Sequence, residues 1–178
     1  MAAALDILRK EHRAIARVLH MLRDIVEDDA VLARGVESGL IAAMLRYLHV
    51  FPYGVHHPKE EQQLFPAMAA RDSGAVAAVA ALVEEHAAGY AFLNDTRRAL
   101  TEIGSQGGSG RLRRAIQNCI AHETRHMKRE EDEILPVAER VLDGETLAAI
   151  AQTFAASDES QKSANIRKMF KSLHGPDR

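Results

Sequence analysis

The sequence of 178 residues has a single cysteine, no tryptophan and almost balanced charges. The one cysteine, Cys119, excludes an internal disulfide and any metal site built from several thiolates. The 23 basic and 25 acidic side chains give a formal net charge of −2, and aromatic residues make up only 4% of the chain. Nucleic-acid backbones and acidic membrane surfaces attract an excess of positive charge, and single strands stack on aromatic rings, so we expect none of these partners.

The sequence also lacks segments typical of transport across a membrane or insertion into one. The residues after Met1 show no basic region followed by an apolar stretch, so no signal peptide is expected. No apolar run approaches the roughly 20 residues that a membrane-spanning helix needs. We therefore expect a soluble, cytoplasmic protein.

Glycine and proline are sparse, and apolar side chains recur at spacings of three and four, which predicts an all-α fold. The helices are expected near residues 3–26, 37–68, 75–103, 111–142 and 145–173. The second either kinks around its prolines or restarts at Pro58, and residues 104–110 read as a flexible glycine-rich loop. Short connections favour an up-down-up-down antiparallel four-helix bundle over residues 1–142, with an additional C-terminal helix and tail over 143–178 that pack on the bundle or extend from it.

The nine histidines are the unusual feature of the composition, and several of them lie in an internal repeat. The first and third predicted helices each contain the pattern Leu-x-x-Glu-His, ending at His12 and His86. The second and fourth each contain His-x-x-x-Glu-Glu-x-x-(Leu/Ile)-(Phe/Leu)-Pro, beginning at His56 and His126. The chain therefore consists of two copies of one helical hairpin.

The spacing within the repeat predicts a metal site. Residues four apart on a helix differ by about 40° around the axis and about 6 Å along it, so their side chains meet on one face. His56 with Glu60, and His126 with Glu130, each combine an imidazole with a carboxylate in this way. Inward-facing histidines and glutamates on all four helices are typical of two-metal centres in bundles, and this ligand set suits iron, manganese or zinc. The minimum set is His12, His56, Glu60, His86, His126 and Glu130.

An ordinary solvated helix face is the alternative interpretation of each His-Glu pair. Lys59, Lys128 and Arg129 lie close by and could make these runs a surface of ion pairs. The pattern occurs twice, however, and each copy follows a Leu-x-x-Glu-His helix whose histidine lies on or beside an apolar stripe. Four matched histidines are hard to explain by packing alone.

These residues resemble the hemerythrin-like, or HHE cation-binding, domain family over roughly residues 5–140. The resemblance rests on Glu11-His12, on the run from His56 to Glu61, on Glu85-His86, and on the run from His126 to Glu131 with the Leu-Pro that follows it. It implies an up-down four-helix bundle that holds two iron ions joined by an oxo or hydroxo bridge. It also implies that the six residues of the minimum set are the ligands, with Glu60 and Glu130 as the bridging carboxylates.

The sequence departs from the oxygen-carrying members at the fifth histidine of the site. Those members have a second histidine four residues after the one on the third helix, where this chain has Tyr90. Tyr90 either binds iron or, as we favour, packs in the core. His122 is one turn before His126 and His57 is next to a ligand, so either could complete the site, and we favour His122. The predicted metal residues are therefore His12, His56, Glu60, His86, His122, His126 and Glu130.

The resulting functional prediction is a non-haem di-iron protein with a position open to a small diatomic molecule or a peroxide. Its role would be to bind, sense, scavenge or store O₂ or NO, or to handle iron under stress. A peroxidase-like or ferroxidase-like redox enzyme is one alternative, and a metal-stapled interaction module is another. His20, His49 and His174 are expected to be structural or solvated, and Cys119 to be a small buried side chain.

Overall fold

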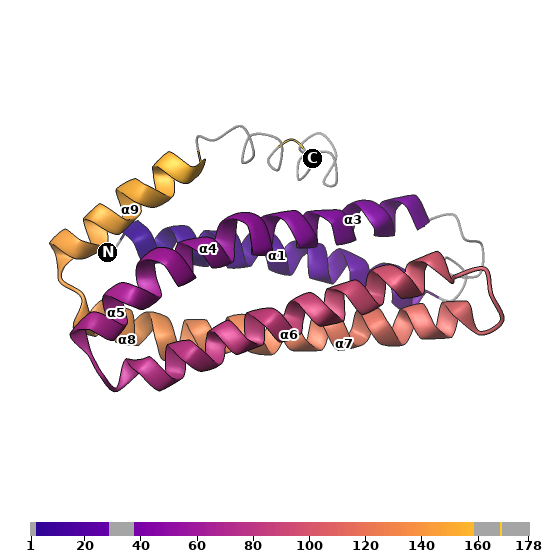
Figure 1. Cartoon of the computed structure of the whole chain (residues 1–178). Helices are drawn as coiled ribbons and strands as arrows, with labels where there is room; N and C mark the ends of the chain where they lie inside the picture. The colour runs from indigo at the N-terminus through magenta and orange to yellow at the C-terminus, as the bar shows by residue number, and fades with distance from the viewer. Residues whose placement is uncertain (1–2, 29–37, 159–167, 169–178) are drawn as a thin grey trace.

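A computed structural model describes residues 3–28, 38–158 and 168 of the chain. Within these ranges the protein is helical and has no strand, and four long helical rods run side by side in alternating directions (Figure 1). This confirms the predicted all-α bundle. The first and third rods are α1 (Ala3–Glu27) and α6 (Ala75–Thr101). The second consists of α3 (Ser38–Phe51), η1 (Pro52–His56), α4 (His57–Lys59), η2 (Glu60–Leu64) and α5 (Phe65–Arg71), and the fourth of α7 (Gly108–Arg129), η3 (Glu130–Ile134) and α8 (Leu135–Val141).

The second rod continues through its prolines because its helix widens locally into π-helical turns. Two of the three π turns, η2 and η3, begin at corresponding glutamates of the repeat, Glu60 and Glu130. Each closes with a backbone N–H that donates to the glutamate carbonyl five residues back, and a proline follows directly. A proline has no N–H to donate and crowds the carbonyl four residues back, so the wider turn accommodates it. Such π turns are frequent at functional sites.

The turn between α6 and α7 is shorter than the sequence predicted. The fourth rod begins at Gly108, inside the stretch expected to be a loop over residues 104–110. Gly107 has a φ of 73°, a left-handed conformation that glycine adopts without strain and that reverses the chain. A Cβ at position 108 would lie 2.3 Å from the carbonyl oxygen of Glu102, so the chain also passes itself closely here.

The apolar core has two parts, separated along the bundle by a layer of histidines and glutamates. In α1, the buried residues Ala4, Leu5 and Leu8 belong to one part, and the buried residues from Ile15 to Val26 belong to the other. His12 lies between them on the same buried face. The bundle therefore places polar ligating groups where water is excluded on both sides.

Helix α9 (Gly144–Asp158) packs against α1 and closes one end of the bundle (Figure 1). It begins after Leu142, whose backbone is extended, and the Asp143 carboxylate accepts a hydrogen bond of 2.8 Å from the Thr146 N–H. Phe154 is completely buried in the core at this end. Of the part predicted as helix beyond Asp158, and of the tail with His174, the structure describes Lys168 alone.

Within the described residues, α6 is the one helix long and apolar enough to cross a membrane by length and composition. It passes this test although Glu84, Glu85 and His86 interrupt its apolar residues. Core helices of bundles pass the same test, and α6 packs along α7 with His86 buried.

Candidate metal centre

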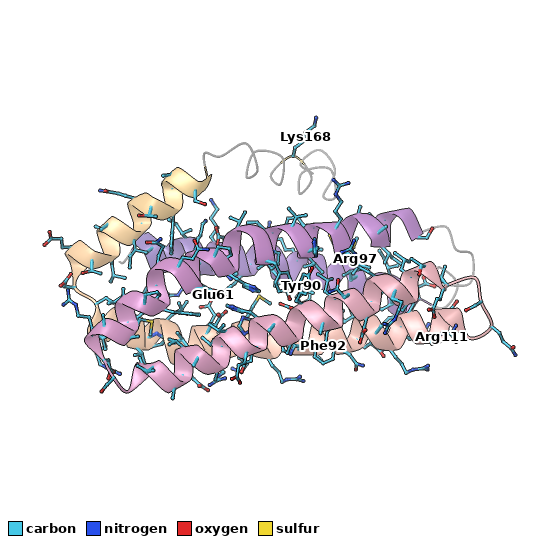
Figure 2. All side chains as sticks on the ribbon, viewed as in Figure 1. Glu61, Tyr90, Phe92, Arg97, Arg111 and Lys168 are labelled. Atoms are coloured by element: carbon cyan, nitrogen blue, oxygen red, sulfur yellow. The ribbon has the colours of Figure 1, made fainter. Side chains whose placement is uncertain are left out.

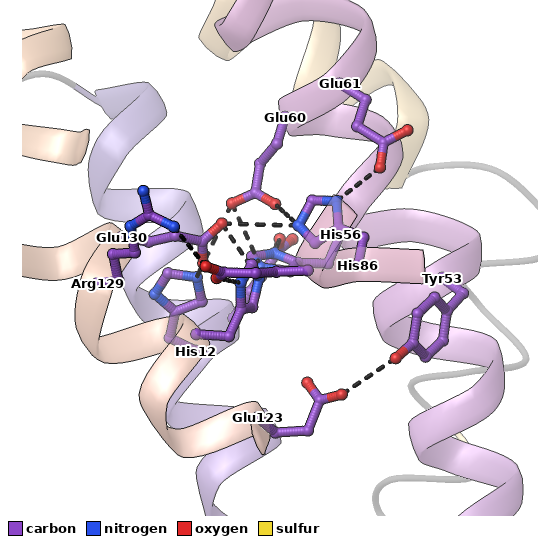
Figure 3. Close-up of polar contacts among 12 residues, drawn as sticks. His12, Tyr53, His56, Glu60, Glu61, His86, Glu123, Arg129 and Glu130 are labelled. Atoms are coloured by element: carbon purple, nitrogen blue, oxygen red, sulfur yellow. Dashed lines mark hydrogen bonds and ion pairs between the residues drawn. The ribbon is translucent and has the colours of Figure 1, made fainter. Parts of the chain in front are cut away.

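All six residues of the minimum ligand set lie in the polar layer, and each is no more than 4% exposed. Figure 3 shows His12, His56, Glu60, His86 and Glu130 directed toward one another. The Nε2 atoms of four histidines and both oxygens of two glutamates are buried, and within the described residues they have no hydrogen-bond partner. An unpartnered buried polar atom costs about 1–3 kcal/mol. Eight such atoms turned toward one another therefore indicate that a cation belongs between them. The histidines are His12, His56, His86 and His126, and the glutamates are Glu60 and Glu130.

The two glutamates lie between two pairs of imidazoles. His12 and His56 form one pair and His86 and His126 the other, each with ring centroids 4.7 Å apart and nearly perpendicular planes. Glu60 directs Oε1 toward His56 at 3.5 Å and Oε2 toward His86 at 3.5 Å.

Glu130 mirrors Glu60 from the fourth rod. Its Oε2 is 3.2 Å from the first pair at His12, and its Oε1 is 3.3 Å from the second pair at His126. Each carboxylate thus presents one oxygen to each pair, which is the arrangement that lets a carboxylate bridge two ions.

His57 extends the second pair into a group of three imidazoles. Its ring stacks on His86 with centroids 3.6 Å apart and planes 7° apart. Ligating atoms of His57, His86 and His126 lie within 4.8 Å of one another, and Nδ1 of His57 is buried without a partner. In the other copy of the repeat the corresponding residue is Met127, so the first pair has no third imidazole at this place.

The other two candidates for the additional ligand, His122 and Tyr90, lie outside the groups of potential metal ligands. The Nε2 of His122 is hydrogen-bonded at 2.9 Å to the backbone carbonyl of Glu85, and the residue belongs to neither group of potential ligands found in the described part of the chain. Tyr90 does not pack in the core as we favoured, because its side chain is 40% exposed on α6. It contacts the rings of His49 and Tyr53.

A second set of four glutamates holds the four inward-facing imidazoles in place. Each of these glutamates is adjacent in sequence to one of the candidate ligands. Each contacts Nδ1 of the histidine on the next rod, and the glutamate on the fourth rod contacts the histidine on the first. The pairs are Glu11 with His56 at 2.9 Å, Glu61 with His86 at 2.6 Å, Glu85 with His126 at 3.0 Å, and Glu131 with His12 at 2.8 Å. A carboxylate on Nδ1 fixes the ring so that Nε2 points into the site and makes that nitrogen a better ligand.

The comparison with family models agrees with this geometry. The model of the hemerythrin HHE cation-binding domain matches residues 3–138. The chain belongs to the hemerythrin HHE cation-binding family. No curated protein and no solved structure gives a significant match. The matched span ends before α9, which begins at Gly144.

Two cations support the carboxylates of this hemerythrin-like site in corresponding places. Lys59 bonds to Glu11, and Arg129 bonds to Glu85. The first of these pairs is buried, because Lys59 is 3% exposed and lies under the ring of Phe154 on α9, 5.5 Å from its centroid. The second is about 30% exposed. The predicted alternative of a solvated surface is therefore wrong for Lys59.

When no cation is present, the charged groups at the centre shift the pKa values of their neighbours. Burial and the neighbouring Glu130 carboxylate raise the pKa of Glu60 well above its usual range. Burial also opposes ionisation of Glu130, but His12 and His86 together hold its pKa well below the usual range. Despite burial, the carboxylates of Glu130 and Glu131 raise the pKa of His12 to about 9. Protons thus occupy nitrogen and oxygen atoms that a metal would otherwise bind.

Sequence reasoning missed the four supporting glutamates, although the signal was present. Glu11 and Glu85 occur in the repeated Glu-His pair, and Glu61 and Glu131 in the repeated Glu-Glu pair. Glu131 follows Glu130 in a run of four acidic residues, where charged side chains are usually solvated, yet it forms a hydrogen bond across the bundle with His12.

Proposed function

We propose that this protein is a non-haem di-iron protein whose metal centre binds a small molecule such as O₂, NO or a peroxide. The observation that carries the proposal is the convergence of eight buried, unpartnered nitrogen and oxygen atoms from four helices. Their chemistry fits the centre that the hemerythrin-like family implies, because imidazole and carboxylate ligands suit iron. Zinc and manganese accept the same ligands, so metal identity is part of what must be tested.

In this proposal Glu60 and Glu130 bridge the two ions. One ion is held by His12 and His56, and the other by His57, His86 and His126, a set supported by the grouping of their ligating atoms. His57 thereby takes the place for which the sequence favoured His122. The bridging role agrees with the carboxylate oxygens, one of which faces each histidine pair.

An exchangeable position follows from the number of ligands. Five imidazoles and two bridging carboxylates, together with one oxo or hydroxo bridge, do not fill the coordination of two octahedral ions. An ion held by His12 and His56 would have fewer imidazole ligands than one held by His57, His86 and His126, and would therefore supply the position open to a small molecule. When bound, the iron pair supplies redox chemistry and a site for a small ligand, and the protein holds the ligands and excludes water. A cytoplasmic location remains part of the proposal.

The decisive experiment measures metal content and the optical spectrum after loading with iron. We expect two irons per chain and oxo-bridge charge-transfer bands. E60A and E130A each remove a bridging carboxylate and should lose loading of the metal pair. E133A is the matched control, because Glu133 is exposed on the same helical segment and bonds to Arg129. One zinc per chain without colour, or full iron content in both bridging variants, would contradict the proposal.

A further inference from the structure

A series of aromatic rings connects the candidate metal centre with the surface. The ring of Tyr53 stands edge-on to His57, with centroids 4.7 Å apart, and His57 in turn stacks on His86. Tyr90 contacts the other side of the series, 5.1 Å from Tyr53 between centroids. Tyr90 is 40% exposed and projects from α6 (Figure 2). Neighbouring rings are thus in contact along the whole path.

Tyr53 also has a proton acceptor in place. Its hydroxyl donates a hydrogen bond of 3.0 Å to Oε1 of Glu123, a residue 6% exposed on α7 (Figure 3). A phenol that loses an electron becomes strongly acidic, so its oxidation requires a base within hydrogen-bond distance.

The contact between Tyr53 and Glu123 explains why α6, the helix that faces them, has a glycine at this place. Gly89 lies inside α6, where glycine costs about 1 kcal/mol relative to alanine. A Cβ at this position would be 2.7 Å from both the Tyr53 hydroxyl and Oε1 of Glu123. Gly89 therefore leaves the space in which the two groups meet.

We propose that Tyr53 and Tyr90 form a one-electron route between the metal centre and the surface, with Glu123 taking the phenolic proton of Tyr53. The inference rests on the proposed redox-active iron centre and names its oxidant as a peroxide. For each electron that leaves Tyr53 toward His57, the O–H bond breaks and the proton moves to Glu123. Tyr90 then reduces Tyr53, Glu123 returns the proton, and Tyr90 releases its own proton to solvent.

The surface end of the route indicates the class of electron donor. The ring of His49 is 5.4 Å from that of Tyr90, and His49 lines a groove of about 700 Å³ between α3 and α6. Arg46, Arg97 and Arg98 also line the groove, together with apolar side chains that include Leu45 and Val50. Cationic and apolar side chains together fit a small organic anion. A donor of single electrons to Tyr90 must also carry a readily oxidised group, such as a phenol or an enediol. Two molecules of such a donor, written RH, each supply one electron and one proton, and each reduces Tyr90 once. The overall reaction is H₂O₂ + 2 RH → 2 H₂O + 2 R•.

The test uses the full chain loaded with iron, mixed with one equivalent of hydrogen peroxide and frozen for electron paramagnetic resonance. The chain has three tyrosines and no tryptophan, so a tyrosyl signal has few possible sources. We expect a tyrosyl radical in the wild type and in Y47F, and its loss in Y53F. Tyr47 is the control because it is buried in the core and stacks on Phe51.

Two further variants test whether Glu123 accepts the proton and whether the electron from the surface donor enters through Tyr90, as opposed to a role of these residues in packing alone. E123Q keeps an oxygen that accepts the hydrogen bond but cannot take the proton, so radical formation should slow by about 100-fold. Y90F should retain the Tyr53 radical but lose its rapid quenching by ascorbate, an anionic enediol. Iron content should match the wild type in all four variants.

The outcomes distinguish this route from the metal centre itself. Two irons and oxo-bridge bands without a tyrosyl radical, or with a radical unchanged in Y53F, would overturn the route and leave the proposed function intact. Equal quenching by ascorbate in Y90F and wild type would overturn the exit through Tyr90. A chain that binds no iron would overturn both proposals.

Discussion

At the scale of single residues, the two hemerythrin-like hairpins differ in a way that has a chemical consequence. His57 in the first hairpin corresponds to Met127 in the second, so an otherwise symmetric site has a third imidazole on one side. Iron prefers an imidazole to the thioether of methionine. The two metal positions are therefore expected to differ in affinity and in access to a small ligand.

The assignment of His57 leads to a paired prediction. Loss of a group that supports a metal ligand typically weakens metal binding 10- to 100-fold. H57A removes a ligand itself, so we expect it to weaken metal binding by at least this factor. H122A should leave metal affinity unchanged, since His122 bonds to a backbone carbonyl. Competition with a coloured chelator measures both. A loss of affinity in H122A alone would restore the sequence-based preference for that residue.

Gly89 gives a second prediction at this scale. G89A should lower the free energy of unfolding by about 1–3 kcal/mol, because the added methyl overlaps Tyr53 and Glu123 and overpacks the site. The higher helix propensity of alanine offsets about 1 kcal/mol of that loss. Urea unfolding provides the measurement.

The matched control is another glycine in a helix, Gly110 of α7. A Cβ there meets only a distal nitrogen of Arg114, at 3.7 Å. G110A should therefore be neutral or stabilising, by no more than about 1 kcal/mol. Equal effects of G89A and G110A would show that the Tyr53–Glu123 pair does not require the glycine.

At the scale of helices, the sequence was sufficient to predict which side chains meet in the centre of the bundle. It was not sufficient to predict the direction in which the residues next to them point. The four histidines and two glutamates follow regular helical spacing within each copy of the repeat, so their common face could be predicted. The choice between His57 and His122 could not, because η1 and η2 lie on either side of α4 and change the rotation per residue. The same holds for Lys59, which is buried by contact with a helix distant in sequence.

Helix α9 supports a prediction of its own. Phe154 is completely buried beside Lys59, and truncation of a buried aromatic residue costs about 3–5 kcal/mol. We expect F154A to weaken docking of α9 and to raise amide hydrogen exchange over residues 144–158. V76A, at a position 49% exposed, should change stability by less than about 0.5 kcal/mol. Unchanged exchange in α9 of F154A would contradict the anchoring role of Phe154.

At the scale of the whole molecule, the metal determines how stability depends on pH. In the metal-free protein the pKa of His12 is raised from 6.5 to about 9, so folding favours its charged form. That contribution, roughly 3 kcal/mol, is complete below pH 6.5 and is lost as pH rises through about 9. We therefore expect the Tm of the metal-free protein to fall between pH 6.5 and 9.

Metal binding should reverse this dependence. A metal needs the neutral imidazole, so binding releases the proton and becomes tighter as pH rises toward 9. The loaded protein should therefore melt at a higher temperature than the metal-free protein, by a margin that grows with pH. Calorimetry of both forms at several pH values measures the margin. A margin that shrinks from pH 6.5 to 9 would contradict the proposed exchange of proton for metal at His12.

The supporting glutamates have a consequence for the order in which the centre can be assembled. Each reaches forward to the next rod in the chain, except Glu131, which reaches back across 119 positions to His12. A chain emerging from the ribosome can form the first three supports in turn, as each successive helix becomes available. Only the last rod supplies both Glu130 and the support for His12. The metal centre can therefore be completed only after the whole bundle has been synthesised. A chain that is interrupted before Glu131 lacks the carboxylate that supports His12.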